Sequence, residues 1–130
     1  MTRQKISLLK PSKASYSYIR HASVIYHSDS FYVFGGYARK DGTYFDSNVI
    51  ARMTMQGSWS ISGQLNTARR GHGIIFDGEY VLVIGGVSGS PKVEKCLLED
   101  GVVMCTEQDP ALTDYYYYPE LYLVPDSYCK

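Results

Sequence analysis

The sequence of 130 residues has few cysteines, no excess of charge and no long apolar run, and each shortage excludes a class of protein. Three cysteines are too few for a disulfide-rich scaffold and lack metal-ligand spacing. Thirteen Lys and Arg balance thirteen Asp and Glu, which argues against nucleic acid or an anionic membrane as the main partner, because both require a basic face. No stretch approaches the ~18 uninterrupted apolar residues of a membrane helix.

Helix signals are also nearly absent, since no segment keeps a capped apolar pattern of period 3.6. Apolar residues make up 45% of the chain, as in a globular protein, and thirteen tyrosines favour strands and half-buried surfaces. These features together predict an all-β fold. Residues 1–14 are polar and are expected to form a poorly ordered lead-in or a short edge strand, and residues 1–18 lack the apolar core of a signal peptide.

Residues 72–86 have the pattern of a β-hairpin. Two short apolar runs are joined by Asp77-Gly78, and a double glycine, Gly85-Gly86, ends the second run. Asp-Gly between apolar runs favours a type I′ turn, in which both central residues have a positive φ. The glycine pair marks a point where the backbone leaves the sheet or passes close to another segment.

The same unit occurs earlier in the chain, at residues 20–36. His21 precedes its first strand, a polar turn follows at residues 27–30, and Gly35-Gly36 ends its second strand. The two histidines, His21 and His72, are expected to occupy equivalent places, with turns that differ by one residue. A repeat of about 50 residues built from strands indicates a propeller, a solenoid or an array.

Each repeat is predicted to gain two further strands after a polar loop. The loops are residues 37–46 and 87–92, the third strands 48–53 and 93–98, and the fourth strands 58–61 and 102–106. The chain therefore divides into the lead-in, two four-stranded antiparallel units at 15–64 and 65–107, and a Tyr-rich segment at 108–130. That last segment is expected to be a partial unit or a closing strand, with an edge strand at 121–124.

The hairpin of the second repeat brings two cysteines together. If Asp100-Gly101 are its turn residues, Cys96 lies opposite Cys105 in a non-hydrogen-bonded pair. Such pairs have Cα atoms ~4.5 Å apart, within reach of a disulfide. The alternative is two reduced thiols side by side. A disulfide would favour an extracellular setting. Cys129 has no evident partner, which leaves a free thiol, an intermolecular bond or a partner outside the sequence.

These features resemble the kelch repeat, in which an arginine and a histidine precede an apolar strand, a second strand ends in Gly-Gly, and a tryptophan follows. The residues that match are Arg20, His21, Gly35, Gly36 and Trp59 in the first copy and Arg70, His72, Gly85 and Gly86 in the second. Residues 65–70 stand at the family's inter-blade segment without its proline, and the fourth strand of the second copy lacks the tryptophan. The resemblance covers residues 15–107 and implies a partial kelch-type β-propeller of two blades plus a C-terminal segment.

A two-blade propeller is incomplete. Propellers have about 4–8 blades, and each blade buries its faces against its neighbours. Two blades alone would leave large apolar faces in water. The chain is therefore expected to be a fragment of a longer propeller or to complete a ring by self-assembly.

No catalytic, cofactor-binding or metal-binding residue is assigned. Residues that recur once per repeat, including His21, His72, Arg20 and Arg70, are expected to be structural, and the double glycines lack the Lys-Ser/Thr and helix of a phosphate loop. Galactose oxidase shares the kelch propeller, but its copper chemistry needs converging imidazole and phenolate ligands. The repeat already accounts for two of the three histidines. We expect no cofactor.

The resemblance implies a non-enzymatic module that binds a protein partner through its rim loops. The longest such loop carries Tyr37, Arg39 and Tyr44, which are residue types that anchor interfaces. The alternative for this loop is a solvated, mobile segment. The alternative function is the C-terminal part of a galactose-oxidase-like extracellular enzyme or a carbohydrate-binding propeller.

Overall fold

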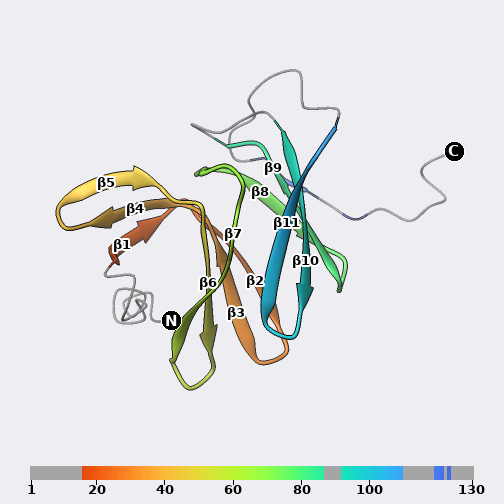
Figure 1. The fold of residues 1–130 in the computed structure, drawn as a ribbon, viewed down its shortest axis with the longest axis horizontal. Coiled ribbons are helices and arrows are strands. Elements are labelled where there is room, and N and C mark those ends of the chain that lie inside the picture. Colours follow the sequence, from red (N-terminus) through yellow and green to blue (C-terminus); the bar gives the residue numbers. More distant parts are fainter. Residues whose placement is uncertain (1–15, 87–91, 110–118, 122, 124–130) are drawn as a thin grey trace, which may run out of the picture.

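The computed structural model describes residues 16–86, 92–109, 119–121 and 123 (Figure 1). These residues form strands joined by turns, as the sequence predicted, and among them no helix is long and apolar enough to cross a membrane. The strands are β1 (Tyr16–Arg20), β2 (Ser23–His27), β3 (Ser30–Phe34), β4 (Tyr37–Lys40), β5 (Thr43–Asp46), β6 (Val49–Thr54), β7 (Trp59–Gln64), β8 (Gly73–Phe76), β9 (Tyr80–Ile84), β10 (Val93–Glu99) and β11 (Val102–Gln108).

Eight strands form one sheet in the order β2-β3-β6-β7-β11-β10-β9-β8. It consists of two antiparallel meanders, the first made of β2, β3, β6 and β7 and the second of β8 to β11. Parallel pairing of β7 with β11 joins the meanders at one side. At the other side β2 lies near β8, where the Ser23 hydroxyl donates to the His72 carbonyl over 2.9 Å. The sheet is therefore barrel-like and nearly closed.

The core lies between the two meanders, because each strand turns alternate side chains inward. Leu65, from the linker of residues 65–72 between β7 and β8, joins the core side chains of both meanders. Those side chains are Tyr32, Phe34 and Ile50 from the first meander and Val81, Val83, Cys96, Leu98 and Val103 from the second. Burial of apolar side chains on this scale holds the meanders face to face.

All eight strands predicted for the two repeats are present, within a few residues at their ends. The prediction of a polar loop at residues 37–46 is wrong, because β4 and β5 form a hairpin there and β4 pairs with β1. Asp41 and Gly42, with φ of 50° and 80°, form its turn. Their positive φ values favour a tight hairpin in spite of the polar composition. In Figure 1 this small sheet projects from the side of the barrel-like sheet.

The two predicted Asp-Gly turns have different outcomes. Asp100 and Gly101 both have a positive φ, 52° and 77°, and Cys96 lies opposite Cys105 as predicted. The prediction for Asp77-Gly78 is wrong, because only Gly78 has a positive φ and the turn is centred on Gly78-Glu79. The Asp77 carboxylate instead accepts the backbone N–H groups of Glu79 and Tyr80 over 2.9 and 2.8 Å. These two donors hold the pKa of Asp77 below its usual value.

The first two strands of the two repeats align at a constant offset of 50 residues, so that residues 23–34 correspond to residues 73–84. At this offset His21 corresponds to Gly71, and both have a positive φ, of 56° and 64°. His72 corresponds to Ala22. The predicted equivalence of the two histidines is therefore wrong by one position, and the turns of the two repeats do not differ in length.

Several predictions lie outside the described residues. They concern residues 1–14, the loop at 87–91, Cys129 and most of the segment at 108–130. Of the predicted strand at 121–124, residues 121 and 123 are described and neither belongs to a strand.

Candidate functional site

The β4–β5 hairpin carries a row of stacked side chains. The rings of Tyr37 and Tyr44 stack with their centroids 5.4 Å apart and an interplanar angle of 18°. Arg39, which lies opposite Tyr44 in the register, places its guanidinium 5.5 Å from the centre of the Tyr44 ring. Tyr44 is 48% exposed and Arg39 is exposed. The three residues that the sequence assigned to a binding loop thus lie together on a strand pair.

Two arginines attach this row to the starts of both repeats. The guanidinium of Arg70 lies 4.2 Å from the centre of the Tyr37 ring, and that of Arg20 lies 5.3 Å from it. Arg70 also lies 3.5 Å from the Asp46 carboxylate at the end of β5. Cations over aromatic faces attract the ring quadrupole, so these contacts hold Tyr37 in place. We call Arg70, Tyr37, Tyr44 and Arg39 the aromatic–arginine row.

A small apolar core lies beneath the hairpin. Ala38 in β4 is fully buried, and Ile19, Phe45 and Val49 pack against it. Alternation along β4 places Tyr37 and Arg39 on the opposite face from Ala38. Arg20 and Arg70 were expected to be structural, and both lie beside Tyr37, one of the predicted binding residues.

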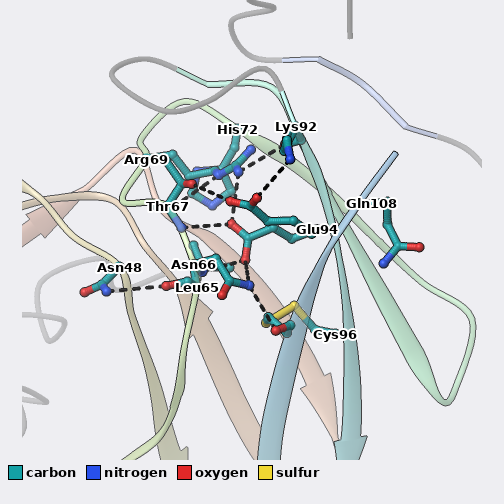
Figure 2. A network of polar contacts seen from close by, with 12 residues as sticks. Asn48, Leu65, Asn66, Thr67, Arg69, His72, Lys92, Glu94, Cys96 and Gln108 are labelled. Atoms are coloured by element: carbon teal, nitrogen blue, oxygen red, sulfur yellow. Dashed lines mark hydrogen bonds and ion pairs between the residues drawn. A yellow bond between two sulfur atoms is a disulfide. The ribbon is translucent and has the colours of Figure 1, made fainter. Parts of the chain in front are cut away.

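A second polar cluster joins the linker between the meanders to β10 and has a buried ion pair at its centre (Figure 2). Arg69 and Glu94 form an ion pair of 3.0 Å in which both side chains are 0% exposed. The Arg69 guanidinium also donates to the carbonyls of Gly85 and Lys92 over 3.0 and 3.1 Å. Glu94 accepts the backbone N–H groups of Asn66 and Thr67 over 2.6 and 3.2 Å.

This cluster fixes the linker to the second meander, and its groups satisfy one another. The Asn66 amide donates to Glu94 and to the Cys105 carbonyl, and the Thr67 hydroxyl lies 3.2 Å from Glu107. Sequence reasoning missed both Arg69 and Glu94, because Arg70 was taken as the arginine of the repeat. The available signals were the Arg-Arg doublet in the linker and an acid at an inward position of β10.

His72 connects the second repeat to the first. Its Nε2 lies 2.9 Å from the Phe34 carbonyl, and the side chain is buried. Burial lowers the pKa of His72 to about 4, the Phe34 carbonyl opposes that shift, and the nearby Arg69 charge adds to it. The neutral ring therefore donates from Nε2, and its Nδ1 has no hydrogen-bond partner among the described residues. His21 is exposed, and its backbone carbonyl accepts the Gly71 N–H over 2.9 Å.

The double glycines allow backbone segments to approach one another closely. A Cβ on Gly35 would lie 2.7 Å from the Arg69 carbonyl oxygen. A Cβ on Gly36 would lie 3.0 Å from the Arg20 carbonyl oxygen, and one on Gly86 would lie 2.8 Å from the Arg70 carbonyl oxygen. The second glycine of each pair thus lies close to the backbone carbonyl of the arginine in its own repeat. Gly85 contributes its carbonyl to Arg69.

The disulfide of the second repeat occupies the position that the cross-strand pair Met53–Trp59 has in the first repeat. Cys96 and Cys105 are joined, with Cα atoms 3.9 Å apart. Phe31 and Val81 are equivalent residues, and they pair with Met53 and Cys96 respectively, so Met53 is equivalent to Cys96. Met53 pairs in turn with Trp59 and Cys96 with Cys105, so Trp59 is equivalent to Cys105. Trp59 is half-buried, and its indole N–H lacks a partner among the described residues.

Within residues 16–86, 92–109 and 119–121 no group of three or more His, Cys, Asp and Glu side chains is arranged to hold a metal ion. A shallow pocket lies at the turn end of the sheet, between His27, Tyr32, Arg52 and Asp100. Arg52 donates to the Ser30 hydroxyl there over 3.0 Å. The aromatic–arginine row therefore remains the best candidate for contact with a ligand.

Comparison with known proteins adds no relative: no family model matches the chain, and no curated protein matches it.

Proposed function

We propose that this chain is a non-enzymatic module of the kelch type that binds a protein partner through its β4–β5 hairpin. The observation that carries the proposal is the aromatic–arginine row on a hairpin that projects from the sheet (Figure 1). Tyrosine and arginine are enriched among the residues that contribute most to protein interfaces.

The contacts of the row are present in the chain without a partner, and this favours binding. The Tyr37 ring lies between the Arg70 guanidinium and the Tyr44 ring, and the Arg39 guanidinium lies over the Tyr44 ring. Ordering a side chain on binding costs roughly 0.5–1.5 kcal/mol, so stacking that is already present reduces this cost. Arg39 and Lys40 are exposed and basic. A protein segment with carboxylates beside an apolar side chain complements this surface.

The propeller is part of the proposal. Two four-stranded antiparallel meanders, each with a double glycine after its second strand, support two kelch-type blades. Further blades in the same polypeptide, or further copies of this chain, would cover the outer faces of the meanders. The parallel pairing of β7 with β11 is an added connection between the two units.

The test is a comparison of two double variants of the purified chain used as bait. Arg39→Ala with Tyr44→Ala removes the exposed half of the row without touching Ala38 or the eight-stranded sheet. Met55→Ala with Gln56→Ala changes two exposed residues at the β6–β7 turn and serves as the matched control. Bound proteins are quantified by mass spectrometry.

We expect the hairpin variant to lose the partners that the wild type and the control retain. Circular dichroism of the three proteins should coincide. The same partners in equal amounts on all three baits would contradict the proposal.

A further inference from the structure

Each meander has an apolar outer face as well as an inner one. In the first meander, Val24 and Tyr26 in β2 pair with Val33 and Phe31 in β3, and all four point away from the core. Val24 is 53% exposed and Tyr26 is 52% exposed. Monomeric soluble proteins rarely expose contiguous apolar patches of this kind.

The second meander has an outer face of a different pattern. Ile75 in β8 pairs with Leu82 in β9, and Leu82 pairs with Lys95 in β10. Leu97 and Met104 extend this face across β10 and β11, and Met104 is 69% exposed. Pro119 and Leu121 lie against Gly73 at the β8 edge of this face, and Leu82, Leu97 and Met104 carry the rest of it on β9, β10 and β11.

The offset of 50 residues relates these outer faces to the inner ones. Val24, Tyr26, Phe31 and Val33 correspond to Ile74, Phe76, Val81 and Val83. In the second meander these four residues point inward and pack in or against the core. The apolar residues on the exposed face of the first meander are therefore equivalent, in the repeat, to the apolar residues that the second meander buries.

The converse relation also holds. Ile25 and Tyr32, which pack in the core from the first meander, correspond to Ile75 and Leu82 on the outer face of the second. A cation occupies the same place in both: Arg52 pairs with Tyr32, and Lys95 pairs with Leu82. The Arg52 guanidinium lies 6.0 Å from the Tyr32 ring centre, and the Lys95 ammonium lies 4.1 Å from that of Tyr80.

We propose that a second copy of this chain docks head to tail, with the outer face of its first meander on the outer face of this chain's second meander. The contact repeats between copies the packing that joins the two meanders within one copy. The two faces differ, so the interface is heterologous, and each copy in a pair still has one face available to bind a further copy. Copies then associate into rings or open chains rather than stopping at a symmetric dimer.

The test uses two variants that each lose one face. Val24→Glu with Tyr26→Glu places charges on the first face, and Ile75→Glu with Leu82→Glu places them on the second. Met55→Glu with Ser58→Glu adds the same charge at the exposed β6–β7 turn as a control. Sedimentation equilibrium over a concentration series gives the mass of each protein and of a one-to-one mixture of the two face variants.

The wild type and the control should exceed the 14.6 kDa of one chain increasingly with concentration. Each face variant should remain a monomer when alone. Their mixture should form a dimer and nothing larger, because one intact face of each kind remains and no other pair can form. Such complementation distinguishes a heterologous interface from a symmetric one.

A wild type that stays monomeric at every concentration would overturn the proposal. So would a mixture that stays monomeric, because the association would then use a symmetric contact or a different surface. Val24→Asp and Leu82→Asp are the milder pair if a double variant fails to fold, as judged by circular dichroism and by an intact Cys96–Cys105 disulfide.

Discussion

Arg69 and Glu94 form an ion pair with no access to solvent, 3.0 Å between Nη2 and Oε2, at the point where the linker meets the second meander. Removing two charges from water is costly, and here the remaining donors and acceptors offset it. Arg69 donates to the carbonyls of Gly85 and Lys92, and Glu94 accepts from Asn66 and Thr67. Such a pair contributes little net stability when complete, but its disruption leaves an unpaired buried charge.

Arg69→Met should therefore lower the free energy of unfolding by about 3–5 kcal/mol, because the buried Glu94 side chain loses its cation. Lys92→Met is the control, since Lys92 lies 3.5 Å from Glu107 in a partly exposed pair, with side-chain exposures of 38% and 33%. Its loss should cost less than about 1 kcal/mol. Urea denaturation of both variants measures the difference, and equal losses would contradict the role given to the buried pair.

The Cys96–Cys105 disulfide should stabilise the protein by about 2–3 kcal/mol, because it closes a short loop in the unfolded chain. Comparing oxidised and reduced protein in a Cys129→Ser background measures this value without exchange with the third thiol. Non-reducing digestion should yield a peptide in which Cys96 and Cys105 are linked. Separate, freely alkylated cysteine peptides would refute the bond.

Folding stability should depend on pH through His72. Its pKa is about 4 in the folded protein and about 6.5 in an unfolded chain, so only the unfolded state takes up a proton between these values. Stability is complete above about pH 6.5, falls as the pH is lowered toward about 4, and this contribution then levels off after a loss of up to about 3 kcal/mol.

His72→Gln tests this assignment, because an amide can still donate to the Phe34 carbonyl but does not titrate. Urea denaturation at a series of pH values should give curves for the two proteins that converge as the pH falls. Parallel curves would show that another group carries the dependence.

Gly35 should not tolerate alanine, because a Cβ there would lie 2.7 Å from the Arg69 carbonyl and 3.1 Å from the His72 ring. Gly42 is the matched control: its φ of 80° is similarly unfavourable for alanine, but a Cβ would meet nothing within 4 Å. Gly42→Ala should cost about 1 kcal/mol and Gly35→Ala clearly more, as measured by the midpoint of thermal unfolding. Equal shifts would show that the two repeats do not approach closely at Gly35.

Local sequence signals predicted the parts of the fold that depend on neighbouring residues. Alternating apolar residues gave the eight strands of the repeats, and the Asp100-Gly101 turn set the register that brings Cys96 opposite Cys105. The same dipeptide was misread at Asp77, where side-chain acceptance of two backbone amides shifts the turn by one residue. It was passed over at Asp41-Gly42, where polar composition concealed the hairpin.

Contacts between distant residues were not visible in the sequence. Nothing near Arg69 indicates that it, rather than Arg70, reaches Glu94, because that choice depends on how the linker crosses the second meander. Tyr37, Arg39 and Tyr44 were predicted to share one loop, and their stacking could not be predicted because it depends on the β4–β5 register. The placement of Arg70 beside Tyr37 depends on the approach of the two repeats.

The parallel pairing of β7 with β11 has a consequence during synthesis of the protein. Gly63 in β7 pairs with Val103 in β11, so β7 emerges from the ribosome well before the strand that covers its edge. A bare strand edge is a template for pairing with other chains. At about 5–20 residues per second this interval lasts several seconds. During this interval the free edge of β7 is open to pairing with another chain.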